Sequence, residues 1–174
     1  MIVSLIGYRG TGKTTVAQGV AIALGWEWID ADVEIELRAG KSINSIFEED
    51  GEPAFRDLES TMVDKLCRRS DVVIAFGGGV VLREENRQRI RAAGPVVWLT
   101  ATAETLAKRI AEDVTTASRR PNLTQKGGII EITAMLDKRT PLYRECASQV
   151  VDTEGKTPAE VADEIIKSLD GRLE

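Results

Sequence analysis

The chain has 174 residues, of which 43% are hydrophobic and 29% charged, with a net charge of −5 and a pI of about 5.0. This length suits a single domain, and the acidic balance argues against a nucleic-acid or anionic-membrane partner. Histidine does not occur, which excludes a histidine metal ligand or general base, and Cys67 and Cys146 lack a metal-binding spacing.

Short apolar runs alternate with helical patterns along the chain. The expected strands are Ile2–Ile6, Trp26–Ile29, Val72–Phe76, Val96–Leu99 and Gln149–Val151, and the expected helices lie near 14–24, 32–39, 53–69, 84–92, 103–112, 128–145 and 158–169. This alternation predicts an α/β domain with a parallel sheet covered by helices on both faces. No leader is expected before the first strand, and the apolar runs are too short to span a membrane, so we expect an intracellular protein.

The first expected strand is followed by Gly-Tyr-Arg-Gly-Thr-Gly-Lys-Thr, residues 7–14. This spacing matches the phosphate-binding loop, and the strand before it and the helix after it are the context that the motif requires. We expect the loop N–H groups and the helix N-terminus to attract an anion. Lys13 would reach the β- and γ-phosphates, and the Thr14 hydroxyl would ligate Mg²⁺. The alternative is a glycine-rich turn that binds nothing.

Carboxylates and glycines follow the next two expected strands, at the edge where ligands of parallel sheets bind. Asp30 could hold Mg²⁺ through water, and Asp32 could accept the proton of an attacking hydroxyl group. Either residue could instead only cap the following helix. Gly77–Gly79 would let a substrate lie against backbone N–H groups, although a plain turn would also use glycine.

Three arginines are candidates for binding anionic groups. Arg56 and Arg139 lie on expected helices, where each could form a two-pronged contact with a carboxylate or phosphate or could simply face solvent. Arg120 lies in a polar stretch with proline and glycine, near 113–126, that has the composition of a mobile lid.

Taken in order, these residues resemble the shikimate kinase family from about residue 2 to 165. The matching positions are Asp30, Asp32, Ile35–Glu36, Gly40, Ile43, Ile46–Phe47, Gly51–Glu52, Phe55–Arg56, Glu59, Gly77–Gly79, Arg120–Pro121, Lys138–Arg139 and Pro141–Tyr143. The resemblance implies a three-layer P-loop kinase fold of the nucleoside-monophosphate-kinase type, with five parallel strands ordered 2-3-1-4-5. Residues 1–174 would form one kinase domain, with a substrate-binding segment at about 32–60 and the lid at about 113–126.

The resemblance also implies an activity and a place for each motif residue. The chain would be a monomeric, cytoplasmic enzyme that uses Mg²⁺ and transfers the γ-phosphoryl group of ATP to the 3-hydroxyl of shikimate, in aromatic amino acid biosynthesis. The residues implied at ATP are Gly10, Thr11, Gly12, Lys13, Thr14, Thr15, Arg109, Arg120 and Lys156. Those implied at shikimate are Asp32, Arg56, Gly77, Gly78, Gly79 and Arg139, with the two arginines at its carboxylate. Lys13, Asp32 and Arg120 would be catalytic, and Thr14 and Asp30 would hold the metal.

Other classes of protein differ from this one in particular motifs. A gluconate kinase would carry an Asp-x-x-His pattern after the second strand and Ser-Ala-Leu-Lys after the third, whereas this chain has no histidine and has Phe-Gly-Gly-Gly. A GTPase would need an Asn-Lys-x-Asp motif, which is absent. A regulatory nucleotide-binding protein without kinase activity could lack Lys13, Asp32 or the lid arginine, and all three are present.

Overall fold

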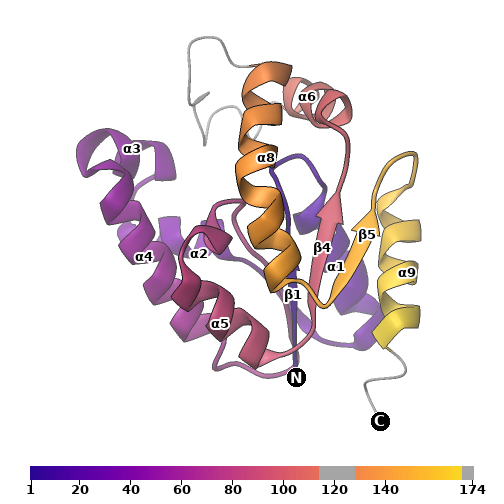
Figure 1. Ribbon diagram of the computed structural model, residues 1–174. Helices are drawn as coiled ribbons and strands as arrows, with labels where there is room; N and C mark the ends of the chain where they lie inside the picture. The colour runs from indigo at the N-terminus through magenta and orange to yellow at the C-terminus, as the bar shows by residue number, and fades with distance from the viewer. Residues whose placement is uncertain (114–127, 170–174) are drawn as a thin grey trace.

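A five-stranded sheet forms the centre of the protein in the computed structural model, which describes residues 1–113 and 128–169 (Figure 1). The strands are β1 (Ile2–Ile6), β2 (Glu27–Asp30), β3 (Val72–Ala75), β4 (Val96–Thr100) and β5 (Gln149–Asp152). Their order is β2-β3-β1-β4-β5, and every neighbouring pair is parallel. The predicted fold class and strand order are confirmed, and each strand lies where its apolar run predicted it.

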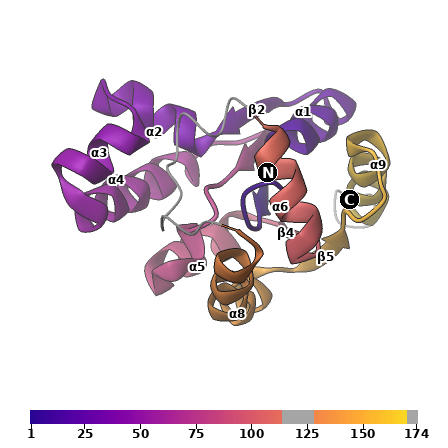
Figure 2. The same cartoon turned by 90° about the horizontal axis from the view of Figure 1, so that it is seen from above.

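Two helices cover one face of the sheet, α1 (Lys13–Leu24) and α9 (Pro158–Leu169) (Figure 2). Their buried residues pack with alternate residues of the central strands, such as Leu5 of β1 and Leu99 of β4. All five residues of β1 are buried, as is typical of a central strand covered on both faces.

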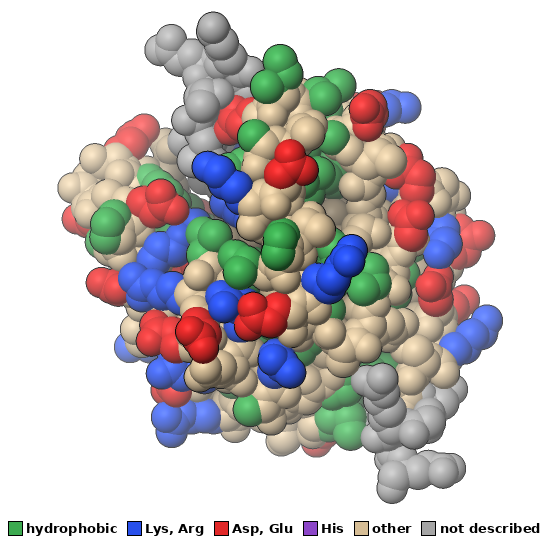
Figure 3. All heavy atoms as spheres, in the orientation of Figure 1, with side chains coloured by type: hydrophobic (Ala, Val, Ile, Leu, Met, Phe, Trp, Pro, Cys, Tyr) green, Lys and Arg blue, Asp and Glu red, His purple; other side chains and the backbone are tan. Residues whose placement is uncertain are grey.

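The opposite face is covered by α4 (Gly51–Leu66), α5 (Glu84–Ala93) and α8 (Ile129–Cys146), with a 3₁₀ turn, η1 (Val80–Leu82), after β3. Beyond these lie α2 (Ala31–Ala39) and α3 (Ile43–Glu49), and α6 (Ala103–Glu112) packs on α8 through Leu106 and Ile132. Positive and negative side chains are interspersed on the surface seen in Figure 3, unlike the basic stripe of a nucleic-acid-binding face. None of the helices in the described part of the chain is long and apolar enough to cross a membrane.

Helix α3 is an element that the sequence analysis did not predict. The Ser42 hydroxyl caps it by accepting a hydrogen bond from the Ser45 N–H at 3.1 Å, and Ile43 and Ile46 are buried. With 7 residues and two buried positions, it is too short to show a helical period in the sequence.

The parallel strands place five connections along one edge of the sheet. The loop at 7–12 follows β1, Asp30 ends β2, Gly77 lies beyond β3, and the segments at 101–102 and 153–157 follow β4 and β5. Because all strands run the same way, residues from these distant parts of the sequence are brought together there.

Candidate functional site

The loop between β1 and α1 has the conformation of an anion-binding concavity. Gly10 and Gly12 have φ angles of 85° and 86°, which a side chain would strain. The Thr11 hydroxyl donates to the Tyr8 carbonyl at 2.8 Å, and Lys13 Nζ donates to the carbonyls of Gly7 and Tyr8 at 2.8 and 2.9 Å. Helix α1 starts directly after this loop, and the N–H groups of a helix N-terminus favour an anion.

Asp30 contacts both the following helix and the phosphate-binding loop. Its Oδ1 accepts hydrogen bonds from the N–H groups of Asp32 and Val33 at 3.0 and 3.3 Å, and so caps α2. Its Oδ2 accepts a hydrogen bond from the Thr14 hydroxyl at 2.7 Å. The capping role and the predicted metal role are therefore compatible in one carboxylate.

The Thr14 and Asp30 oxygens fit Mg²⁺ by their chemistry. Mg²⁺ takes oxygen ligands, usually one or two from the protein together with phosphate oxygens and water. Within residues 1–113 and 128–169, no cluster of three or more acidic, histidine or cysteine side chains could hold a metal. The donor set thus suits a metal ion that binds together with a nucleotide.

A cavity of about 580 Å³ opens over the loop, and we call it the nucleotide-side cavity. Of the residues predicted at ATP, it is lined by Gly10, Gly12, Lys13, Thr14, Thr15 and Arg109. Thr11 is absent from this lining because its side chain is buried beneath the loop, at 2% exposure. Asp32 and Gly77, predicted at shikimate, also line this cavity.

Arg109 joins α6 to two of the connections at this edge of the sheet. Its Nη1 donates to the Gly10 carbonyl at 3.3 Å and to the Thr153 hydroxyl at 2.9 Å, and its Nη2 donates to the Thr153 carbonyl at 3.1 Å. Nearby, hydrogen bonds from the Thr105 hydroxyl and then the Thr102 N–H lower the pKa of Glu154. The wall of the nucleotide-side cavity at Arg109 is therefore held by several polar contacts.

Besides Thr11, two residues predicted at ATP are not placed in the cavity. Lys156 lines neither cavity, and its ammonium group contacts Glu164 of α9 at 2.6 Å, so its place at ATP stays a prediction. Arg120, with the predicted lid beyond Asp113, lies outside the described residues. Asp113 itself lines the nucleotide-side cavity.

A second cavity, of about 130 Å³, adjoins the first, and we call it the acceptor cavity. Arg56 from α4, Arg139 from α8 and the glycines Gly78 and Gly79 all line it. Arg139 is 7% exposed, its Nε has no hydrogen-bond partner among the described residues, and its guanidinium lies 5.9 Å from the centre of the Tyr8 ring. A buried guanidinium with an N–H group that lacks a hydrogen-bond acceptor is typical of a site that takes an anion.

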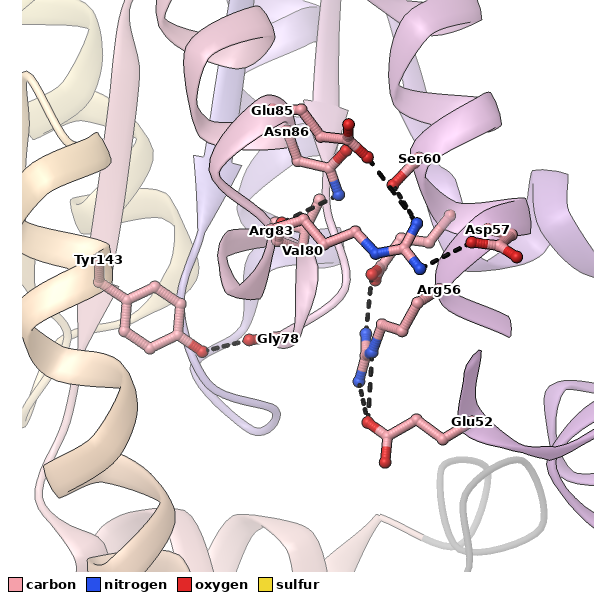
Figure 4. Close-up of polar contacts among 11 residues, drawn as sticks. Glu52, Arg56, Asp57, Ser60, Gly78, Val80, Arg83, Glu85, Asn86 and Tyr143 are labelled. Atoms are coloured by element: carbon pink, nitrogen blue, oxygen red, sulfur yellow. Dashed lines mark hydrogen bonds and ion pairs between the residues drawn. The ribbon is translucent and has the colours of Figure 1, made fainter. Parts of the chain in front are cut away.

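Arg56 is held in the acceptor cavity by two carboxylates of its own helix (Figure 4). Its Nη1 donates to Glu59 Oε2 at 2.7 Å, and its Nη2 and Nε donate to Glu52 Oε1 at 3.2 and 3.3 Å. A Cβ atom at Gly79 would lie only 2.3 Å from Arg56 Nη1. The glycine at 79 is therefore needed for this packing and is more than a flexible turn residue.

Arg9, Ile43 and Gly78 line both cavities and so form a shared wall between them. The sequence analysis did not single out Arg9, because it occupies a variable position of the phosphate-binding motif. The signal that could have identified Arg9 is its positive charge inside a phosphate-binding motif. Arg9 adds a cation to both linings, which also contain acidic side chains such as Asp32 and Glu52.

Comparison with known proteins agrees on one family. The family model for shikimate kinase matches residues 9–170. A shikimate kinase of Rhodopirellula baltica is 43% identical over 164 residues, which are 94% of this chain and 88% of the relative. The solved structure of a shikimate kinase from Acinetobacter baumannii in complex with shikimate has a TM-score of 0.91 at 33% identity, covering 98% of this chain and 93% of that one. A gluconokinase structure from Sinorhizobium meliloti, 17% identical with a TM-score of 0.58, shares only the fold.

Proposed function

The chain belongs to the shikimate kinase family, and we propose that its two adjoining cavities bind ATP and shikimate for phosphoryl transfer. It is a kinase that transfers the γ-phosphoryl group of ATP to the 3-hydroxyl of shikimate. One observation supports the assignment of residues to the two substrates: Arg56 and Arg139 both line a small cavity beside the phosphate-binding loop. Shikimate carries one carboxylate and three hydroxyl groups, and this cavity is lined by the arginines Arg56 and Arg139 and by glycine backbone.

On the nucleotide side, the N–H groups of the loop and of the first turn of α1 bind the phosphates. Lys13 neutralises charge on the β- and γ-phosphates as it develops during transfer, which is worth several kcal/mol in a preorganised site. Thr14 and Asp30 hold Mg²⁺, directly or through water, and the metal supplies charge neutralisation of the phosphate oxygens. Arg109 would lie near the nucleotide base, since it closes the cavity on the side of α6.

On the acceptor side, Arg56 and Arg139 bind the carboxylate of shikimate, and Gly77–Gly79 present backbone N–H groups to the ring substituents. Asp32 orients the attacking hydroxyl and accepts its proton. Its place in the nucleotide-side cavity, which adjoins the acceptor cavity, suits a group that acts where donor and acceptor meet. Arg120 of the lid remains the proposed second cation on the transferred phosphoryl group.

We also propose a monomeric, cytoplasmic enzyme that acts on small molecules and binds no nucleic acid or membrane. The use of ATP as a substrate supports the cytoplasmic location, and the acidic pI of about 5.0 argues against polyanionic partners. Size-exclusion chromatography with light scattering would test the oligomeric state directly.

The carboxylate assignment is tested by comparing shikimate with its methyl ester. A charge-assisted hydrogen bond is worth about 1.5–3 kcal/mol, so the ester should bind roughly 10- to 150-fold more weakly. Because Arg139→Ala removes the same contact, it should lose affinity for the acid and show little further loss with the ester. The KM for ATP, measured in parallel, should stay nearly constant. Equal phosphorylation of acid and ester by the wild type would contradict the assignment.

A further inference from the structure

Side chains from two helices hold the carbonyl groups of the segment after β3. The Tyr143 hydroxyl of α8 donates to the Gly78 carbonyl at 2.5 Å, and Asn86 Nδ2 of α5 donates to the Val80 carbonyl at 3.2 Å (Figure 4). Arg87 Nη1, also from α5, donates to the Val81 carbonyl at 2.8 Å. Side chains thus hold three carbonyls of one short segment, and this segment lines the acceptor cavity through Gly78 and Gly79.

The contact at Gly78 sets the direction of the next N–H group. In a planar trans peptide, the carbonyl of one residue and the N–H of the following residue point in opposite directions, and the described residues contain no cis peptide. Because the Gly78 carbonyl is directed at Tyr143, the Gly79 N–H is directed away from α8. Gly79 itself lines the acceptor cavity and lies against the Arg56 guanidinium.

Tyr143 is itself well fixed in place. It is fully buried, and its ring stacks on Trp98 of β4 with ring centres 5.7 Å apart. It lies four residues after Arg139 on α8 and therefore on the same face of that helix. Arg87 is attached to the same helix, since its Nε donates to Glu145 Oε1 at 3.1 Å. Helix α8 therefore carries one side chain that lines the acceptor cavity, Arg139, and also supports the glycine backbone that lines it.

We propose that Tyr143 and Arg87 are positioning residues for the acceptor. Tyr143 fixes the Gly78–Gly79 peptide, and Arg87 fixes the turn after it. The Gly79 N–H is thereby aimed at the bound substrate and held at a constant position relative to Arg139. Neither side chain needs to contact the substrate for this role. The proposal rests on the proposed function, because it assigns the supports of the same acceptor site.

The main variant is Tyr143→Phe, which keeps the ring and its stacking on Trp98 and removes only the hydroxyl. We expect its KM for shikimate to rise about fivefold or more, since a buried carbonyl loses its partner and the loop can reorient. Its KM for ATP should stay within about twofold. Arg87→Lys keeps a positive charge near Glu145 but loses the guanidinium geometry. It should also raise the KM for shikimate, by a smaller factor, and leave the KM for ATP within about twofold.

Ser148→Ala is the matched control. It removes a side chain that donates to the Val96 carbonyl at 3.1 Å and accepts from the Val96 N–H at 3.0 Å, at the opposite end of β4 from the site. A general loss of stability lowers the fraction of active enzyme and hence the apparent kcat, without a selective change in one KM. All proteins are therefore assayed well below the lowest Tm, with Tm measured for each.

A selective rise in the KM for shikimate in both variants, absent from Ser148→Ala, supports the proposal. It is overturned if folded Tyr143→Phe keeps the wild-type KM for shikimate, if the KM for ATP rises equally, or if the control behaves alike. If Tyr143→Phe does not fold, Arg87→Lys decides by the same criteria. A wild-type enzyme that fails to phosphorylate shikimate would overturn the proposed function and this inference with it, whereas an active wild type with unaffected variants overturns this inference alone.

Discussion

Replacing Gly79 with alanine should damage the acceptor site while leaving the fold nearly intact. Gly79 has φ −94° and ψ −1°, which alanine adopts readily. However, the new Cβ atom would lie 2.3, 2.5 and 2.6 Å from Nη1, Nη2 and Cζ of Arg56. To reach ordinary contact at 3.4 Å, the guanidinium must withdraw by about 1 Å, which is enough to break a hydrogen bond.

The expected loss is that of one charge-assisted contact with the substrate carboxylate. At about 1.5–3 kcal/mol this predicts a roughly 10- to 150-fold higher KM for shikimate. Because the obstructed atoms are the end of a flexible side chain, Tm should fall little. An assay coupled to ADP release, with shikimate varied at saturating ATP, measures the effect, and the KM for ATP is the internal reference.

The double variant tests the cause. In an Arg56→Ala background there is no guanidinium to displace, so adding Gly79→Ala should cost nothing further. Two results would refute the reasoning: an unchanged KM for shikimate in Gly79→Ala alone, or an equally large increase when Arg56 is already absent.

Three further predictions concern the loop, the two carboxylates and pH. Lys13→Met should fold normally and lose most of its turnover, because a fixed charge on the transferred group is worth several kcal/mol; turnover within about threefold of wild type, measured by the same coupled assay, would exclude Lys13 from the mechanism. Asp32→Asn should depress kcat with ATP binding retained, whereas Asp30→Asn should raise the Mg²⁺ concentration needed; rescue of the Asp32 variant alone by Mg²⁺ would mean that the roles are reversed. Glu154 has a lowered pKa, so the stability it contributes is present above its ordinary pKa of 4.5 and is lost as the pH falls below it. Glu154→Gln should therefore show a smaller decrease of Tm over that acidic range, and an identical pH profile would contradict the contribution.

The strands could be predicted because burial on both faces leaves a plain signal. Every residue of β1 and β3 is buried, and all of them except Ser4 of β1 are apolar. Runs of this length are too short to compete as helices. Helix α3 left a weaker signal, since its apolar face consists of Ile43, Ile46 and the partly buried Phe47, which is a single helical turn. Its capping residue, Ser42, was the available clue.

The sequence motifs predicted the chemistry of the site better than the way its residues are distributed between the two cavities. Spacing alone identified the loop around Lys13 and suggested that Arg56 and Arg139 bind an anion. It could not show that the site is divided into two cavities with a shared wall, because that depends on how α2, α4 and α8 pack around the sheet. Nor could it show that the Arg56 guanidinium leaves no room for a side chain at position 79, since Arg56 and Gly79 belong to elements that are distant along the chain.

The shared wall of Arg9, Ile43 and Gly78 has a consequence for inhibitor design. Because the two cavities adjoin, one molecule could fill both, with an anionic ring compound in the smaller and a phosphate-bearing group over the loop. Such a bisubstrate compound would lose translational and rotational freedom once instead of twice, and the second half would bind at a high effective concentration set by the linker. The linker should be short and should pass the Gly78 backbone, where no side chain obstructs it.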